Sequence, residues 1–239
     1  EEVNGPFAKM VIKLYYMPIS GPCRAVLLTA RYLNIHLELI EVNLLKREQI
    51  KQDFIRINPQ HCVPTIDDDG FILWECRAIM QYFVNKYRAG HSVYPEEPHL
   101  RANVDRLLYF DIGTIVAAQV EVTASQIVFG VTPDQSKLDN LKDKLRILDG
   151  ILAENDFVAG STLTLPDISI AAYITTLAAV NFDIYKFENI SRWIKRLKST
   201  LPDFSEINEK NVTRYKQMIE NGEFRKVYNP LYQYYKSKR

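Results

Sequence analysis

The first part of the chain alternates between short runs of β-branched and aromatic residues and stretches with helical periodicity. A parallel β-α-β unit with a right-handed crossover is expected at the start, and an acidic turn at 67–70 indicates a β-hairpin. The predicted strands are 11–17, 37–42, 64–66 and 71–73, and the predicted helices are 23–33, 48–57 and 75–87. This order predicts an α/β layer sandwich of thioredoxin-like size.

The rest of the chain has no strand-like alternation. Gly90, Pro95 and Pro98 mark residues 88–98 as a linker. Helical periodicity then predicts an all-α domain with helices at 100–128, 135–154, 165–180, 189–199 and 204–221. Thr164 and Asp167 are expected to cap the third of these helices. We therefore divide the chain into a thioredoxin-like domain (10–87), the linker, a helical domain (99–225) and a tyrosine-rich tail (226–239).

Composition excludes several classes of function. The 239 residues carry a net charge of +1, and the Lys and Arg residues are scattered, so neither nucleic acid nor an anionic membrane is an expected partner. Three cysteines are few, and an odd number cannot all pair, so a disulfide framework is not expected. This favours a reducing, cytoplasmic location. No uninterrupted apolar run approaches the ~20 residues that span a bilayer. Residues 1–9 are polar and unlike a signal peptide, and Met10 is a plausible natural start.

Ser20 and Cys23 stand at the first predicted strand-to-helix turn, where thioredoxin-like proteins place a C-x-x-C pair. Because a hydroxyl replaces the first thiol, disulfide exchange is disfavoured. Ser20 either caps the helix or donates a hydrogen bond to a bound thiolate, helped by the helix dipole. The segment alone leaves both interpretations open.

Two further segments contain candidate binding residues. Pro64 begins a strand and is either an ordinary strand-start proline or a cis proline that exposes a backbone edge for a peptide. His61 is either a surface residue or a ligand contact, and the four histidines show no metal-ligand spacing. Glu75 opens a helix, where it either complements the dipole or pairs with an ammonium beside a carboxylate site. Together these sites fit a peptide with an amino-acid head and a central thiol.

The segments YYMPISGPCRAVLL, NPQHCVPTIDDDGFILWECRAIMQY and AGSTLTLPDISIA resemble, in order and spacing, those of glutathione transferases of the insect delta/epsilon group. The similarity covers residues 11–200. It implies the cytosolic glutathione transferase fold and glutathione as co-substrate, without a metal. The implied glutathione contacts are Ser20 at the thiolate, Val63 and cis-Pro64 at the cysteinyl unit, Glu75, Cys76 and Arg77 at the glutamyl end, and His61 and Gln49 at the glycyl end.

The resemblance also implies a second-substrate pocket, formed by Leu44, Ile112, Val116 and Gln119, with Asp111 supporting Arg77 from behind. Relatives often have aromatic residues on this helix, so we expect a roomier pocket that is less suited to ring stacking. Cys76 replaces a usual serine. A thiol is a weaker donor, so either glutathione binding weakens or the change is neutral, and a helix N-terminus could lower its pKa and make it oxidisable. The tail either folds over the pocket mouth or is disordered.

The implied reaction is attack of the glutathione thiolate on hydrophobic electrophiles in a detoxifying homodimer. Such electrophiles include halogenated aromatics, unsaturated carbonyls, hydroperoxides and organochlorines. One rival interpretation is a weakly catalytic or non-catalytic carrier of hydrophobic ligands such as steroids. A second rival is a thiol-disulfide reductase that uses Cys23, although packing inside the helix is the simpler role for this residue.

Overall fold

A four-stranded mixed sheet forms the first half of the protein. The computed structural model describes residues 11–236, so the expectations for residues 1–9 and for the end of the tail lie outside the described residues. The strands β1 (Ile12–Tyr16), β2 (Leu37–Glu41), β3 (Thr65–Asp68) and β4 (Phe71–Trp74) have the order β2-β1-β3-β4. β1 and β2 are parallel, and β3 and β4 form the expected hairpin. The predicted thioredoxin-like arrangement is confirmed.

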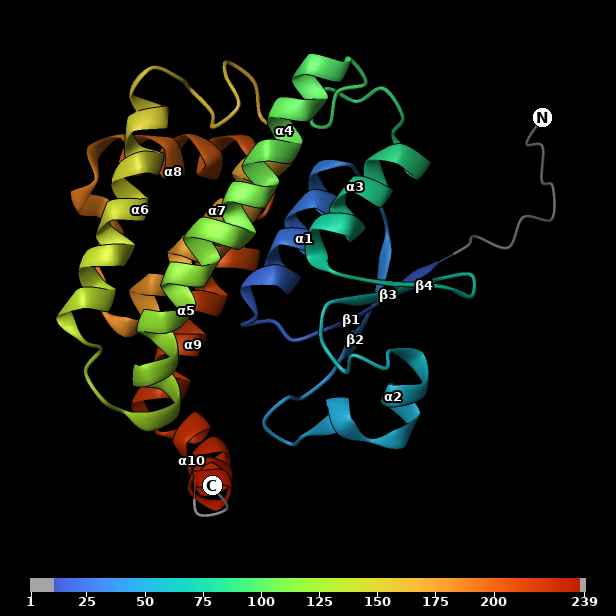
Figure 1. Ribbon diagram of the computed structural model, residues 1–239. Coiled ribbons are helices and arrows are strands. Elements are labelled where there is room, and N and C mark those ends of the chain that lie inside the picture. The colour runs from blue at the N-terminus through green and yellow to red at the C-terminus, as the bar shows by residue number, and fades with distance from the viewer. Residues whose placement is uncertain (1–10, 237–239) are drawn as a thin grey trace.

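Helices cover both faces of this sheet. α1 (Gly21–Tyr32) and α3 (Cys76–Tyr87) lie on the face toward the helical half, and α2 (Gln52–Ile57) lies on the other face (Figure 1). The predicted helix at 48–57 is in two pieces, because a 3-10 turn at Glu48–Ile50 ends before α2 begins. Phe54 of α2 packs edge-on against Tyr15 of β1 with ring centroids 5.8 Å apart. This contact fixes α2 on its side of the sheet.

The second half is helical, as predicted. A long helix combines α4 (Pro98–Phe110), a π-helical stretch (Asp111–Val116), α5 (Ala117–Ala124) and a second π-helical stretch (Ser125–Phe129). It is followed by α6 (Gln135–Ala153), α7 (Leu165–Ile174), 3-10 stretches at Thr175–Val180 and Ile184–Lys186, α8 (Glu188–Thr200), a π-helical stretch (Ser205–Glu209), α9 (Lys210–Glu220) and α10 (Glu223–Lys236). The predicted boundary between 225 and 226 falls inside α10, and the unit boundaries themselves stay predictions.

The long helix is unusually apolar. Pro98–Val128 spans 31 residues and contains an 18-residue window with a mean hydropathy of 1.3, so by length and composition it could cross a bilayer. Polar residues such as Asp111 and Glu121 interrupt the helix, so it has no continuous apolar run of membrane-spanning length. However, 44% of the window is buried inside the protein, where the helix packs on α6 and α7. Packing in the core therefore accounts for part of the apolar character of this helix.

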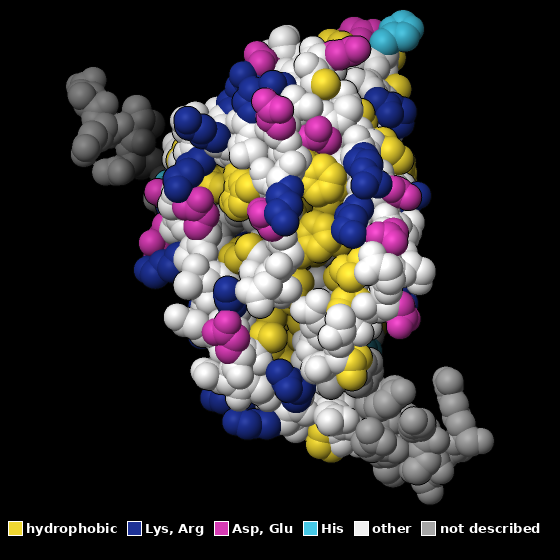
Figure 2. All heavy atoms as spheres, turned by 90° about the vertical axis from the view of Figure 1, so that its left-hand side faces the viewer, with side chains coloured by type: hydrophobic (Ala, Val, Ile, Leu, Met, Phe, Trp, Pro, Cys, Tyr) yellow, Lys and Arg dark blue, Asp and Glu magenta, His cyan; other side chains and the backbone are white. Residues whose placement is uncertain are grey.

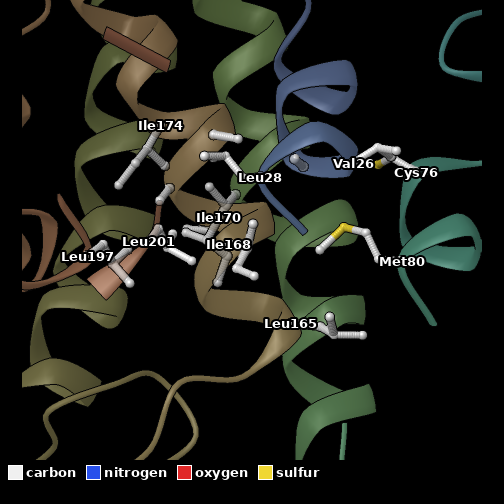
Figure 3. Packing of buried hydrophobic residues seen from close by; sticks show 14 of the residues in the cluster. Val26, Leu28, Cys76, Met80, Leu165, Ile168, Ile170, Ile174, Leu197 and Leu201 are labelled. Atoms are coloured by element: carbon white, nitrogen blue, oxygen red, sulfur yellow. The ribbon is translucent and has the colours of Figure 1, made fainter. Parts of the chain in front are cut away.

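α7 lies at the centre of one continuous core that joins both halves. Figure 3 shows side chains of α1, α3, α7 and α8 directed into this core. The predicted cap of α7 is confirmed, because the Asp167 carboxylate accepts the Thr164 main-chain N–H and hydroxyl, each at 2.8 Å. It also accepts the Trp193 indole N–H at 2.9 Å. Burial raises the pKa of Asp167 to about 6, although these hydrogen bonds act in the opposite direction.

Charged side chains are interspersed on the surface. On the face shown in Figure 2, Lys and Arg alternate with Asp and Glu, and hydrophobic atoms lie between them. The surface on this side therefore has no large region of one sign.

Among residues 11–236, the cysteines Cys23, Cys62 and Cys76 are all free thiols.

Candidate active site

Ser20 lies at the junction between the sheet and α1. Its main-chain N–H donates to the Met17 carbonyl at 3.0 Å, and its own carbonyl accepts the Arg24 N–H at 3.0 Å. Ser20 therefore holds the N-cap position. Its hydroxyl nevertheless makes no capping hydrogen bond to the helix. Of the two interpretations of this serine, the structure disfavours a side-chain cap and leaves the hydroxyl available to a ligand.

Cys23 is unsuited to disulfide exchange. The side chain is fully buried within α1. Burial raises the pKa of the Cys23 thiol to about 12, and the Ser20 hydroxyl offsets only part of that rise. Because the thiolate is the nucleophile in thiol-disulfide exchange, this thiol is inert at neutral pH. The structure thus disfavours the reductase interpretation.

Asn58 organises the loop that precedes β3. Its buried amide donates to the Cys62 carbonyl at 3.1 Å and to the Thr65 hydroxyl at 2.9 Å. This frame holds the Val63–Pro64 peptide bond, which is cis as expected. Sequence reasoning did not identify Asn58, although an Asn-Pro pair ahead of a strand is a recognised turn signal.

The loop presents a main-chain edge and an exposed imidazole. The main-chain N–H and carbonyl of Val63 form no hydrogen bond with any other group among residues 11–236. His61 is exposed and has a φ of +44°. Gln49 lies in the 3-10 turn before α2, and its buried amide oxygen has no partner among the same residues. These three residues have polar groups available to a ligand.

The N-terminus of α3 is a second group of free donors. No side chain caps this helix, so the main-chain N–H groups of its first turn, from Cys76 onward, are unpaired within it. Glu75 holds the N-cap position with φ of +72° and ψ of +106°. A non-glycine residue in this conformation stores roughly 1–3 kcal/mol of strain, which is common at ligand sites. The arrangement is suited to a carboxylate at the helix N-terminus.

Arg77 and Asp111 form a buried ion pair between α3 and the long helix. Arg77 donates to Asp111 Oδ2 from Nε at 2.9 Å and from Nη2 at 2.5 Å. The Ser169 hydroxyl of α7 donates to the same oxygen at 2.5 Å. Burial raises the pKa of Asp111, against the opposing effect of Arg77, while Asp111 keeps the Arg77 guanidinium charged. The expectation that Asp111 supports Arg77 has a direct geometric basis here.

Cys76 does not have the lowered pKa that its position suggested. The thiol is 3% exposed, and burial raises its pKa to about 11, although the Arg77 charge acts in the opposite direction. Its sulfur lies 3.5 Å from Arg77 Nη1 and 3.9 Å from the Tyr173 hydroxyl. The expectation of a lowered pKa is therefore wrong, because desolvation outweighs the effect of the helix N-terminus.

A cavity of about 360 Å³ adjoins Ser20. Of the residues predicted to form the second-substrate pocket, Leu44 and Gln119 line it, whereas Ile112 and Val116 do not. Ile112 is 42% exposed on another face of the helix. The π-helical stretch at Asp111–Val116 takes more residues per turn than an α-helix, so it breaks the regular spacing that placed these residues on one face. Along the long helix, the residues that line the cavity begin at Gln119, about one turn after the sequence suggested.

Aromatic side chains line this cavity, contrary to the expectation of a ring-poor pocket. They come from α7, α9 and α10 rather than from the long helix, and they are Tyr173, Tyr215, Phe224 and Tyr228. Tyr215 and Phe224 pack edge to face with centroids 5.2 Å apart. The sequence showed a tyrosine-rich tail, and α10 indeed runs beside the pocket. Nothing in local periodicity reveals the inward direction of these rings.

Tyr173 connects the cavity with the N-terminus of α3. Its ring lines the cavity, and the Arg77 guanidinium carbon lies 5.0 Å from the ring centroid. The Ser20 cavity and the Glu75–Arg77 group are therefore neighbouring parts of one region. No group of three or more His, Cys, Asp or Glu side chains in the described part of the chain is placed to hold a metal ion.

Comparison with known proteins gives consistent matches. Residues 14–92 match the glutathione S-transferase N-terminal domain and residues 128–200 the C-terminal domain. Glutathione S-transferase D7 of Anopheles gambiae is 37% identical over 82% of this chain and 91% of its own. A delta-class glutathione transferase of Nilaparvata lugens superposes with a TM-score of 0.85 at 40% identity, covering 88% of this chain and 99% of its own. Glutathione transferase E6 of Drosophila melanogaster superposes with a TM-score of 0.80 at 33% sequence identity, covering 89% of this chain and 98% of its own.

Proposed function

The chain belongs to the glutathione S-transferase family, and we propose that it conjugates the glutathione thiolate to small hydrophobic electrophiles, with the Ser20 hydroxyl stabilising the thiolate. Membership rests on the two family domains and on insect delta and epsilon relatives. The role of Ser20 is supported mainly by its hydroxyl, which lies at the N-terminus of a 12-residue helix but makes no capping hydrogen bond to it. It opens onto the cavity of about 360 Å³.

The free polar groups beside Ser20 match the chemistry of glutathione. The N-terminus of α3 suits the glutamyl carboxylate, and Glu75 suits its ammonium. The unpaired main chain of Val63 suits the cysteinyl amide, and His61 with Gln49 would face the glycyl end. Arg77, held by the Asp111 carboxylate that also accepts the Ser169 hydroxyl, would orient the glutamyl end. Glutathione held by these groups would place its sulfur next to the Ser20 hydroxyl.

The lining of the cavity supports a hydrophobic electrophile with a ring. Four aromatic residues and several aliphatic ones surround the space beyond Ser20. Flat rings gain about 0.5–1.5 kcal/mol from favourable aromatic contacts beyond their area burial. We therefore favour halogenated aromatic electrophiles over small aliphatic ones. Enclosure by the protein supplies proximity between the sulfur and the electrophilic carbon, which is the other part of the rate enhancement.

The test is steady-state kinetics with glutathione and a chloronitrobenzene for the wild type and Ser20→Ala. Loss of a hydrogen-bond donor to an anion costs about 100-fold in kcat. We therefore expect the kcat of Ser20→Ala to fall by this factor, with a glutathione KM equal to that of the wild type. Ser161→Ala, an exposed serine outside the site, serves as the control and should match the wild type. Equal, slow rates in all three proteins would instead favour a carrier of hydrophobic ligands.

We also propose that two copies associate through the long helix. Tyr109 is 75% exposed and Ile112 is 42% exposed, and they lie about one turn apart. A two-fold contact would place these exposed side chains of one copy against the same surface of the other copy. Light scattering after size exclusion should give a dimer for the wild type and a monomer for Tyr109→Glu. A wild-type monomer would contradict the proposal.

A further inference from the structure

A buried arginine lies one helical turn after Ser20. The Arg24 side chain is 0% exposed, and its main-chain N–H donates to the Ser20 carbonyl. The guanidinium reaches from α1 into the helical half. There it donates to the Ala172 carbonyl at 2.8 Å, to the Thr176 hydroxyl at 2.5 Å and to the side-chain oxygen of Asn208. Arg24 thus joins the first turn of α1 to two segments that are distant in sequence.

All of these acceptors are neutral. No ion pair within residues 11–236 includes Arg24, and its Nε has no partner there either. The carboxylates of the π-helical stretch that contacts α1 are already paired, Glu206 with Lys210 and Glu209 with Lys198, each at 2.8 Å. Burial lowers the pKa of Arg24 to about 10, which still leaves it charged at neutral pH.

A buried charge without a counter-charge is costly, because hydrogen bonds to neutral groups replace only part of the lost hydration. A glutamine could donate hydrogen bonds to some of the same oxygens without this cost. The hydrogen bonds alone therefore do not account for an arginine at this position. Its positive charge calls for a separate explanation.

The field of this charge reaches the Ser20 cavity. Tyr215 lines the cavity together with Ser20. Burial raises the pKa of Tyr215 to about 12, and the Arg24 charge acts in the opposite direction by stabilising the phenolate. Arg24 therefore acts electrostatically on a group that faces the same space as the Ser20 hydroxyl. A bound thiolate in that space would be stabilised in the same way.

The other ionisable groups around this space contribute little net positive charge. Burial raises the pKa values of the thiols and phenols, so these groups are neutral at pH 7: Cys23, Cys76, Tyr173, Tyr215 and Tyr228. Arg77 and Asp111 compensate each other. Glu75 is an acidic residue at the start of α3, and the exposed Arg47 acts to lower the pKa of Tyr228 against the effect of burial. Arg24 is the buried, uncompensated cation beside the start of α1.

We propose that Arg24 stabilises the thiolate of glutathione bound beside Ser20, as a fixed positive charge that acts together with the Ser20 hydroxyl and the N-terminus of α1. This inference rests on the proposed function. Arg24 is a positioning residue, because it does not touch the sulfur, and the thiol proton leaves to water. A unit charge about 10 Å away at an effective dielectric constant of about 20 shifts a pKa by roughly one.

The test is a pH titration of the thiolate absorbance of glutathione bound at saturation. The wild type should show a thiol pKa below that of free glutathione, and Arg24→Gln should raise it by roughly one. Arg31→Gln is the matched control, since Arg31 lies on the same helix, is exposed and pairs with Asp203 at 3.4 Å. Solvent and salt screen that position, so the control should leave the bound thiol pKa unchanged.

Two further variants separate charge from structure. Arg24→Lys keeps the charge but loses hydrogen bonds, and Asn208→Ala removes an acceptor while Arg24 stays. Both should lower the melting temperature and leave the bound thiol pKa near the wild-type value. If both raise the pKa as they lose stability, the role is structural and the proposal is wrong. This pair can overturn the proposal even if Arg24→Gln fails to fold.

The outcomes also separate this inference from the proposed function. A wild type that does not lower the thiol pKa of bound glutathione overturns thiolate activation, and the role of Arg24 with it. If the wild type lowers the thiol pKa of bound glutathione and folded Arg24→Gln gives the same pKa, only the role of Arg24 is overturned. A rise in Arg24→Gln that is absent in Arg31→Gln and Arg24→Lys supports the proposal.

Discussion

The two sides of the site are built in different ways. On the polar side, the loop before β3 and the start of α3 are close together in sequence and present main-chain groups, and Arg77 pairs with Asp111 of the long helix. On the apolar side, the long helix, α7, α9 and α10 each contribute side chains to the cavity. The polar side is held by hydrogen bonds of fixed direction, whereas the apolar side is held by non-directional packing.

This difference assigns a different kind of specificity to each side. Leaving a buried polar group unpaired costs about 1–3 kcal/mol or more, so the polar side should accept one ligand, glutathione, for every reaction. A hydrophobic pocket discriminates similar ligands by only about 10–200-fold. The apolar side should therefore tolerate many electrophiles. Changes on the polar side should affect all reactions equally, and changes on the apolar side should depend on the electrophile.

The largest effect is expected for Asp111→Ala on the polar side. It leaves the mostly buried Arg77 without its counter-charge, which lowers the free energy of unfolding by about 3–5 kcal/mol. The glutathione KM should rise by about 10–100-fold with every electrophile, because Arg77 loses its orientation and a hydrogen bond to a charged group contributes about 1.5–3 kcal/mol. Thermal denaturation and kinetics with two unrelated electrophiles measure both effects.

Asp139→Ala provides the control for this experiment. Asp139 pairs with Lys142 at 3.1 Å on the exposed face of α6. It should leave the glutathione KM and the melting temperature at wild-type values. An effect of Asp111→Ala on one electrophile only would contradict the division between the two sides.

Cysteine alkylation should show the next largest effect. The pKa of Cys76 is about 11, compared with an ordinary value of 9.0. A raised pKa lowers the thiolate fraction at every pH below it, so at pH 8 Cys76 should react about 100-fold more slowly than an ordinary thiol. The rate should increase about tenfold for each pH unit up to pH 10.

Mass spectrometry after timed iodoacetamide treatment identifies the modified residue. The partly exposed Cys62 should be alkylated first, while buried Cys23, with a pKa of about 12, should be the last. Prior unfolding in denaturant should equalise the three rates. Rapid modification of native Cys76 at pH 8 would show that the start of α3 is far more open than this structure indicates.

On the apolar side, Tyr228→Leu should have a moderate effect. The half-buried ring from α10 lines the cavity, and aromatic contact contributes about 0.5–1.5 kcal/mol, which corresponds to about 2–12-fold. The KM for a chloronitrobenzene should rise by this factor, and the glutathione KM should not change. Val116→Ala, outside the cavity lining, should leave both constants unchanged. An equal rise for a small aliphatic electrophile would contradict a role in ring contact.

The polar side was largely predictable because its determinants are local. The turn before Ser20 and the proline at position 64 are each visible within a few residues, and the structure has the cis bond. The Thr164–Asp167 cap of α7 is equally local, and the structure has it too. The cavity lining does not include Ile112 and Val116, because a π-helical stretch breaks the regular α-helical spacing. The inward rings of α9 and α10 depend on tertiary packing, which no local pattern encodes.

The smallest effect is expected for Cys76→Ser, which restores the residue usual in relatives. A hydroxyl is a stronger donor than a thiol, so the sequence favoured tighter glutathione binding with serine. In the structure, however, the sulfur faces Arg77 and the Tyr173 hydroxyl, which would hold the new hydroxyl inside the protein. The glutathione KM should therefore change by about twofold or less, since a neutral hydrogen bond contributes about 1 kcal/mol and here would form within the protein. A tenfold lower KM would show that the hydroxyl reaches the glutamyl carboxylate instead.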